Sequence, residues 1–207
     1  MTSTYSPLPT QQTVIRQQEN FKVGVSKNVP LPELFEPNMV LIKTVAVTLN
    51  PCDWKMPARF PSPGVLDGCD FAGTIVKVGN GVTKPLKVGD RVFGAVHGSN
   101  PACPQSGSFA DYIAAYADFV FVAPESMSWE TAAAFGGIGI GTIGVALFYS
   151  LKPPGTIESP AEKPSYVLVS GGASASGTMA IQCLRLSVPH DFPIVKDKCT
   201  DQPAEQD

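Results

Sequence analysis

Residues 68–94, GCDFAGTIVKVGNGVTKPLKVGDRVFG, decide how the first half of the chain folds. Two runs rich in apolar and β-branched residues, 71–79 and 90–96, are separated by Gly79-Asn80-Gly81 and Lys87-Val88-Gly89-Asp90. Glycine and asparagine adopt the positive φ that many tight turns require, whereas β-branched and aromatic residues favour extended backbone. The stretch therefore predicts two strands connected through turns.

Similar short runs lie on both sides of this stretch. Residues 21–25 (FKVGV) and 39–49 (MVLIKTVAVTL) predict strands before it, and residues 108–124 (SFADYIAAYADFVFVAP) predict two further strands that meet near Tyr116–Asp118. The 19 glycines and 20 prolines of the chain also favour turns and short strands over a helical bundle. Many short strands separated by turns are typical of a barrel or a sandwich.

The pattern changes after Pro124. Ser128 is a suitable helix N-cap, Glu130 stands in the first turn, and the alanines of ESMSWETAAAF favour a helix, which we expect to continue to about Leu151. The proline-rich residues 151–164 predict an exposed connection, because proline has no backbone N–H to donate. We expect the boundary between two substructures here.

Residues 166–187 predict a strand (YVLV, 166–169), a loop of small residues (SGGASASG, 170–177) and a helix. Small residues before a helix let a pyrophosphate approach backbone N–H groups, and the helix dipole favours its negative charge. Because the spacing is not G-x-G-x-x-G, nucleotide binding and an ordinary turn both remain open at this point. Residues 188–207 are mostly polar and predict a frayed tail with one short strand at 192–195.

Composition narrows the class of protein. A net charge of -3 and a pI near 5.4 argue against a nucleic-acid partner, which would need a basic field. The first residues lack a secretory signal, and the most apolar segment, 132–151, is interrupted by glycines and polar residues. We interpret it as a buried helix of a cytoplasmic protein, not as a membrane span. The five cysteines form no C-x-x-C pair, so we expect reduced thiols and no metal site.

Two polar motifs stand next to predicted strands. NPCDWK, residues 50–55, follows the strand at 39–49 directly and is expected to lie on a strand-end loop, a common location for functional groups. A turn capped by Asp53 explains the same residues equally well. GCDFAG, residues 68–73, is explained by a tight bend. Neither motif indicates a site by itself.

The order of the motifs is more informative. NPCDWK, GCDFAGTIVKVG, GDRVFG, GSFADYI, APESMSWETAAAF and VLVSGGASASGTMAIQ together resemble the medium-chain dehydrogenase/reductase superfamily over about residues 10–187. The resemblance implies an α/β fold with a β-rich N-terminal part. A GroES-like, partly open β-barrel (1–127) would be followed by a connecting helix and an incomplete Rossmann fold (128–187), and then by a disordered polar tail (188–207).

The resemblance also indicates a branch of the superfamily. Zinc alcohol dehydrogenases have a cysteine ligand where this chain has Asn50 and a histidine ligand where it has Cys69, so the resemblance is to the zinc-independent branch. QQTVIRQ, NPCDWKM and MAIQCLRLS are similar to the fungal trans-acting enoyl reductases. Such an enzyme is implied to be a monomer that uses NADPH to reduce the α,β-unsaturated intermediates carried by a partner polyketide synthase, by hydride transfer.

Site residues follow from the same resemblance. Lys55 would be the catalytic residue. The cofactor would be bound by Cys52, Asp53, Trp54, Lys55, Ala173, Ser174, Ala175 and Ser176. The substrate would be bound by Gly141, Thr142, Ile143, Gly144, Val145, Ala146 and Leu147.

Two alternatives to this function remain open. One is a stand-alone quinone or enone oxidoreductase of the same branch. The other is a non-catalytic GroES-like module that binds a partner through an exposed apolar surface. Chains of the family are longer and the resemblance ends near residue 187, so we expect a C-terminally truncated relative, for which an active and an inactive form both fit.

Overall fold

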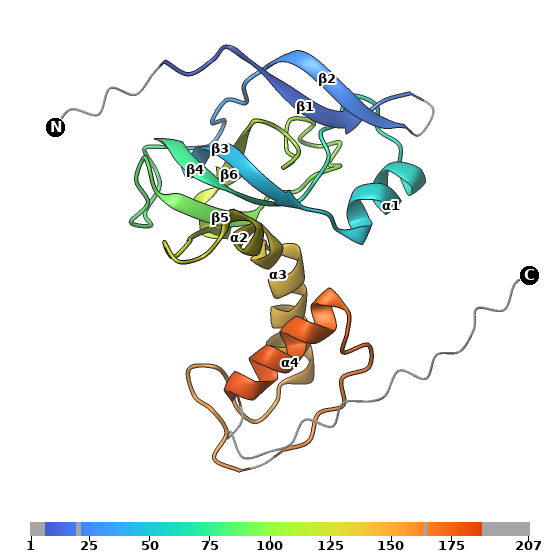
Figure 1. The fold of residues 1–207 in the computed structure, drawn as a ribbon, viewed down its shortest axis with the longest axis vertical. Helices are drawn as coiled ribbons and strands as arrows, with labels where there is room; N and C mark the ends of the chain where they lie inside the picture. The colour runs from blue at the N-terminus through green and yellow to red at the C-terminus, as the bar shows by residue number, and fades with distance from the viewer. Residues whose placement is uncertain (1–6, 20–21, 164, 188–207) are drawn as a thin grey trace, which may run out of the picture. The chain divides into compact units, whose positions relative to one another are not determined.

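A computed structural model of the chain describes residues 7–19, 22–163 and 165–187 (Figure 1). It divides into two compact units, Met1–Ile138 and Gly139–Asp207. The first unit extends past residue 127 because the helix that follows packs on its strands, and the domain limits expected from the sequence stay a prediction. The polar tail at 188–207, with its expected strand at 192–195, lies outside the described residues.

The first unit contains two open antiparallel sheets. Strand β1 (Gln11–Gln17) pairs with β2 (Val23–Pro30). The second sheet has the order β6-β3-β4-β5-β7. Its strands are β3 (Met39–Thr48), β4 (Asp70–Val78), β5 (Arg91–Ala95), β6 (Tyr112–Tyr116) and β7 (Val120–Val122). The short helix η1 (Ala117–Phe119) lies between β6 and β7, where the sequence predicts that two strands meet. All the strands expected between residues 21 and 124 are confirmed.

The core of the first unit is made by alternate residues of β3, β4 and β5. Ile42, Phe71, Ile75 and Val92 are fully buried in one cluster. Gly73 allows β4 to approach β3 closely, because a Cβ at this position would lie 2.2 Å from the carbonyl oxygen of Lys43. The strands therefore depend on apolar alternation and on one position that accepts no side chain.

A helix follows β3 where we expected a loop. Helix α1 spans Pro51–Arg59, with Asn50 in extended conformation as its N-cap. The loop expectation was wrong because proline is well tolerated at the first helical position, where its missing N–H would have no partner in any case. Asp53 then stands in the first turn of α1, where the helix dipole favours a carboxylate.

The helical segment after Pro124 is not continuous. Helix α2 spans Trp129–Phe135, and the amide of Thr131 donates to Ser128 Oγ at 3.1 Å, which confirms the predicted cap. The chain then breaks at Gly136, whose φ is +29°, before α3 (Ile138–Gly144) and the π-helical segment η2 (Val145–Leu151). The single helix expected up to Leu151 was therefore wrong, because Gly136 adopts a backbone conformation that a helix excludes.

Residues 129–151 are also the one stretch of the described chain that is long and apolar enough to cross a membrane, with 28% of its most apolar window buried. Length and composition alone are weak evidence for such a role, and core helices of water-soluble proteins have the same properties. The break at Gly136 interrupts the stretch near its start.

The second unit has its own small apolar cluster. Helix α4 (Ala175–Ser187) contributes Ala180, Cys183 and Leu184, which pack with Ile143 and Leu147. The spacing of the three α4 residues places them on one face of that helix.

The strand predicted at 166–169 is absent. Tyr166 and Leu168 are 89% and 86% exposed, whereas Val167 and Val169 pack against the apolar cluster. The exposure alternates with the period of a strand, but no neighbouring strand in the described part of the unit completes a hydrogen-bonded ladder. The Rossmann fold is therefore incomplete, as expected.

Truncation of Phe71 tests the assignment of the first core. The ring is fully buried between β3 and β5, so Phe71→Ala is expected to lower the free energy of unfolding by about 3–5 kcal/mol. Phe60→Ala is the matched control, because this ring is 62% exposed and its loss is expected to cost about 0.5 kcal/mol or less. Denaturant unfolding of both variants gives the comparison, and similar losses would contradict the assignment.

Candidate functional site

The candidate site begins where β3 passes into α1. The backbone N–H of Asn50 donates to Asp53 Oδ2 at 2.7 Å, and the N–H of Asp53 donates to the carbonyl of Asn50 at 3.0 Å. These reciprocal bonds fix the first turn of α1 and hold the Asp53 carboxylate against it. The side chains of Cys52 and Asp53 are thereby set in position.

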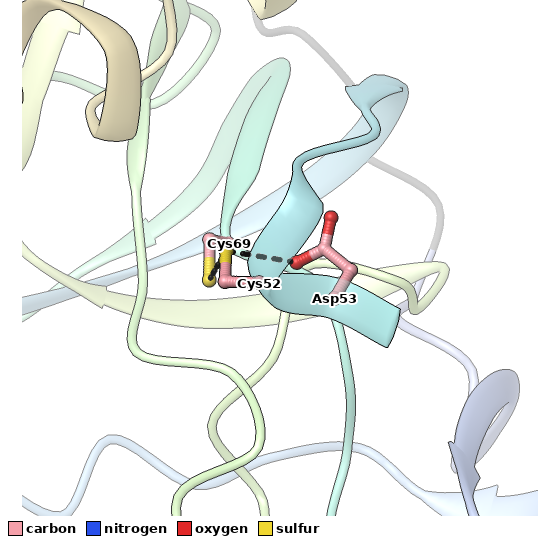
Figure 2. A group of neighbouring side chains, drawn as sticks. All are labelled: Cys52, Asp53 and Cys69. Atoms are coloured by element: carbon pink, nitrogen blue, oxygen red, sulfur yellow. Dashed lines mark hydrogen bonds between the residues drawn. The ribbon is translucent and has the colours of Figure 1, made fainter. Parts of the chain in front are cut away.

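Two cysteines from different elements meet at this turn (Figure 2). Cys52 lies in α1 and Cys69 directly precedes β4, and their Sγ atoms are 3.9 Å apart. The Cys52 thiol also donates to Asp53 Oδ1 at 3.6 Å. Burial raises the pKa of both thiols, and the neighbouring Asp53 carboxylate raises the pKa of Cys52 further. At neutral pH both groups are therefore thiols in this state of the protein, and not nucleophilic thiolates.

Asp70 joins this turn to the end of α2. Its buried carboxylate accepts a hydrogen bond from Asn50 Nδ2 at 2.8 Å and from the backbone N–H groups of Gly137 and Ile138 at 2.8 and 3.0 Å. A Cβ at Gly136 would lie 2.3 Å from Asp70 Cγ, so only glycine fits there. Asp70 therefore positions both Asn50 and the start of α3.

A third buried carboxylate lies beside the same turn. Asp67 Oδ1 accepts hydrogen bonds from Ser99 Oγ at 2.8 Å and from the N–H of Gly68 at 2.9 Å. Burial raises the pKa of Asp67 and of Asp53, and the charge of Asp67 adds to the rise at Asp53. The site is thus a buried acidic cluster, and the hydrogen-bond partners of Asp53, Asp67 and Asp70 named above are neutral groups.

The second unit holds the other predicted cofactor residues. Ser174 Oγ accepts from the N–H of Gly177 at 3.1 Å and so caps α4, while the Ser174 hydroxyl donates to the carbonyl of Gly171 at 2.8 Å. Gly171 has a φ of +72°, which lets the loop turn into the helix. Residues 173–176 are exposed at the start of α4. They remain available to a ligand.

The remaining predicted residues have different environments. Lys55 and Trp54 are exposed on α1, with Lys55 Nζ 5.4 Å from the centre of the Trp54 ring. Of the predicted substrate residues 141–147, Ile143 and Leu147 are buried in the apolar cluster of the second unit. Gly141, Thr142, Val145 and Ala146 are exposed and Gly144 is half-buried.

The sequence did not predict that Asp67, Asp70 and the pair Cys52 and Cys69 lie together beside the α1 turn. The sequence did contain a signal for α1, because asparagine followed by proline and then by aspartate at the third helical position is a helix start. The contact between Cys52 and Cys69 had no such signal, since it depends on how β3 and β4 pair.

Asp67 allows a test of the buried charge. Its raised pKa means that the folded state favours the protonated carboxyl, so the folded state loses stability as the pH rises above the ordinary value of 3.8. Asp67→Asn keeps an acceptor for Ser99 and Gly68 and removes the charge. We compare the melting temperature of Asp67→Asn with that of the unchanged chain at each pH. The difference, variant minus unchanged chain, is expected to be more positive at pH 7 than at pH 4.

The exposed Asp118→Asn is the control, with an expected change of about 0.5 kcal/mol or less at both pH values. A thermal melt at each pH measures both variants. A relative loss of stability of Asp67→Asn at pH 7 would contradict the assignment.

Comparison with known proteins agrees with this architecture. Residues 36–125 match the alcohol dehydrogenase GroES-like domain. The chain is 55% identical over 201 residues to a trans-enoyl reductase of Aspergillus clavatus, covering 92% of this chain and 55% of that protein. It is 51% identical over 185 residues to a trans-enoyl reductase of Pyricularia grisea, covering 89% and 50%.

A solved structure shares the fold over both units. The alcohol dehydrogenase superfamily protein of Novosphingobium aromaticivorans superposes with a TM-score of 0.72 at 25% identity, covering 86% of this chain and 51% of that one. The chain thus spans about half the length of the relatives that it matches. The first unit thus contains a segment similar to the alcohol dehydrogenase GroES-like domain, and the chain as a whole is similar to proteins of the alcohol dehydrogenase superfamily.

Proposed function

We propose that this chain acts as a trans-acting enoyl reductase, which transfers a hydride from NADPH to an α,β-unsaturated polyketide thioester. The observation that carries the proposal is the 55% identity to a trans-enoyl reductase over 92% of the chain. An aligned region that covers 92% of the 207 residues includes both the α1 turn and the α4 loop. The reduced nicotinamide supplies the hydride, and the protein supplies position and electrostatics.

The start of α4 fits the pyrophosphate of a dinucleotide. Residues 173–176 are small and exposed. Gly177 is buried, and a Cβ there would lie 2.3 Å from the carbonyl oxygen of Gly171, so no side chain fits at this position. The loop backbone can therefore approach a phosphate closely, with the positive end of the helix dipole beneath it. The choice of NADPH over NADH is part of the proposal.

Lys55 is the proposed catalytic residue. Addition of hydride to the β-carbon of an enoyl thioester places negative charge on the carbonyl oxygen, and the α-carbon must then receive a proton. The exposed ammonium group of Lys55 on α1 can donate a hydrogen bond to that oxygen, and the α-carbon takes its proton from solvent. Cys52 and Asp53 lie in the rigid first turn of α1, which carries Lys55. We also propose that Cys52 and Asp53 contact the cofactor.

The proposed substrate surface lies on α3 and η2. Ile143 and Leu147 are buried in the apolar cluster of the second unit and cannot contact a substrate. We therefore assign the substrate contacts to the exposed residues Gly141, Thr142, Val145 and Ala146. An acyl chain suits this set of small residues, three of which are apolar and one of which, Thr142, carries a hydroxyl. We propose that the chain works in the cytosol as a monomer and receives its substrate from the carrier domain of a polyketide synthase.

Ala175→Asp tests the cofactor site. Aspartate in the first turn of α4 is compatible with the helix dipole, but its charge would repel a pyrophosphate, so we expect NADPH to bind at least tenfold more weakly without a loss of helix. Ala175→Gln is the neutral control and should bind like the unchanged chain. Calorimetry with NADPH and a thermal melt measure this, and equal affinity in all three proteins would contradict the site.

Lys55→Met tests the catalytic role. We expect the rate of NADPH-dependent reduction of a carrier-bound enoyl thioester to fall about 100-fold or more. Lys87→Met, a change at another exposed lysine of the first unit, should leave the rate unchanged. If the unchanged chain reduces small quinones but not the thioester, it is a stand-alone oxidoreductase. If it binds no NADPH, the proposed function of this chain is wrong.

A further inference from the structure

The connection between η2 and α4 carries a loop that projects from a fixed base. Gly155 is buried, whereas residues 156–160 are all exposed. A Cβ at Gly155 would lie 2.3 Å from the backbone nitrogen of Ala161 and 2.3 Å from the carbonyl oxygen of Ser187, so no side chain fits at the start of the loop. The N–H of Ala161 donates to that same carbonyl at 3.0 Å. Both ends of the loop are therefore held at the C-terminal end of α4.

Ser159 and Pro160 stand on the exposed part of this loop, which belongs to neither a helix nor a strand. The N–H of Ser159 donates to Thr156 Oγ1 at 3.1 Å, and the N–H of Thr156 donates to the carbonyl of Ser159 at 2.9 Å. These bonds join neighbours within the loop, and the Ser159 hydroxyl has no hydrogen-bond partner among the described residues. An exposed hydroxyl on a surface loop, followed by proline, is accessible to a protein kinase that selects serine before proline.

A second serine before proline, Ser62, has the opposite environment. Its side chain is half-buried, its N–H donates to Gln17 Oε1 at 2.7 Å, and its hydroxyl donates to the carbonyl of Phe60 at 3.4 Å. Gln17 is only 3% exposed, so this contact anchors Ser62 to β1. A kinase binds the segment around its serine in extended form, which at Ser62 requires that these bonds break. The two serines therefore differ in accessibility, although each precedes a proline.

The position of Ser159 also determines what a phosphate would do there. Phosphoserine adds a charge of about −1.5 to −2 at pH 7. The base of the loop lies on the last carbonyl groups of α4, the negative end of the helix dipole, and Glu158 and Glu162 flank the serine. Lys163 and Arg185 are nearby in the loop and in the last turn of α4, but both are exposed, and exposed ion pairs contribute little. Repulsion therefore exceeds attraction, and a phosphate weakens the contact between the loop and α4.

We infer that Ser159 is phosphorylated by a proline-directed protein kinase and that the phosphate destabilises α4. The γ-phosphoryl group of ATP moves to Ser159 Oγ. The bond from the γ-phosphorus to its bridging oxygen breaks and ADP leaves, while a bond from phosphorus to Oγ forms and the hydroxyl proton is released. The site uses no residue of the proposed catalytic, cofactor or substrate sets, so the inference does not depend on the proposed reductase activity.

Phosphate transfer by a mitogen-activated protein kinase with ATP and Mg²⁺ tests the site. Synthetic peptides of residues 57–67 and 154–164 give the preference of the kinase for Ser62 and Ser159 without the fold. We expect the rate at Ser159 divided by the rate at Ser62 to rise about tenfold or more from the peptides to the folded 207-residue chain, because only Ser62 must first be released from its contacts. Mass spectrometry of proteolytic fragments measures both rates.

Amide hydrogen exchange measures the effect on α4. After phosphorylation we expect the α4 amides to exchange about twofold or more faster at low salt, because added negative charge at the end of the helix favours local opening. At about 1 M NaCl the difference should shrink, since salt screens the repulsion. Ser159→Ala, incubated with the same kinase and ATP, is the matched control. It lacks only the acceptor hydroxyl, and its α4 amides should exchange like those of the untreated chain.

Three results would overturn the proposal. One is a folded chain that takes up no phosphate at Ser159. The second is a ratio of Ser159 to Ser62 phosphorylation that is the same in the folded chain and in the peptides. The third is unchanged or slower exchange of the α4 amides after phosphorylation, which would show that Lys163 or Arg185 compensates the added charge.

Discussion

The buried carboxylate of Asp70 is the constraint on which the site depends. A buried carboxylate is costly without hydrogen-bond partners, so β4 can begin with this residue only if donors come to it. The Asn50 amide arrives from the end of β3, and two backbone N–H groups arrive from the break after α2. Because Asn50 in turn caps α1, one side chain of the sheet determines where α1 begins and where α3 begins.

This arrangement limits the chemistry that the α1 turn can perform. Burial raises the pKa of the Cys52 and Cys69 thiols, so neither is a nucleophilic thiolate at neutral pH. The same turn can still position an exposed neighbour such as Lys55, which is the use that the proposed reductase makes of it.

Local patterns predicted most of the first unit and little of the site. The strands follow from apolar alternation and from glycine turns, as at Phe71 and Gly79, which act within a few residues. Helix α1 was missed because Asn50-Pro51 directly after a strand was interpreted as a strand-end loop, although proline is well tolerated at the first helical position. The contact of Cys52 with Cys69 spans 17 residues and requires β3 and β4 to pair first, so no local pattern contains it.

At residues 166–169 the sequence has the alternating pattern of a strand, and the exposure of the side chains follows it, but no hydrogen-bonded strand forms there. Exposure alternates as in a strand, with Val167 and Val169 packed inward, yet an isolated extended segment makes no ladder. Ordering each residue costs about 1–2 kcal/mol, and among the described residues a small apolar cluster offsets part of that cost. A dinucleotide bound at the proposed site at the start of α4 would therefore add stability to the second unit.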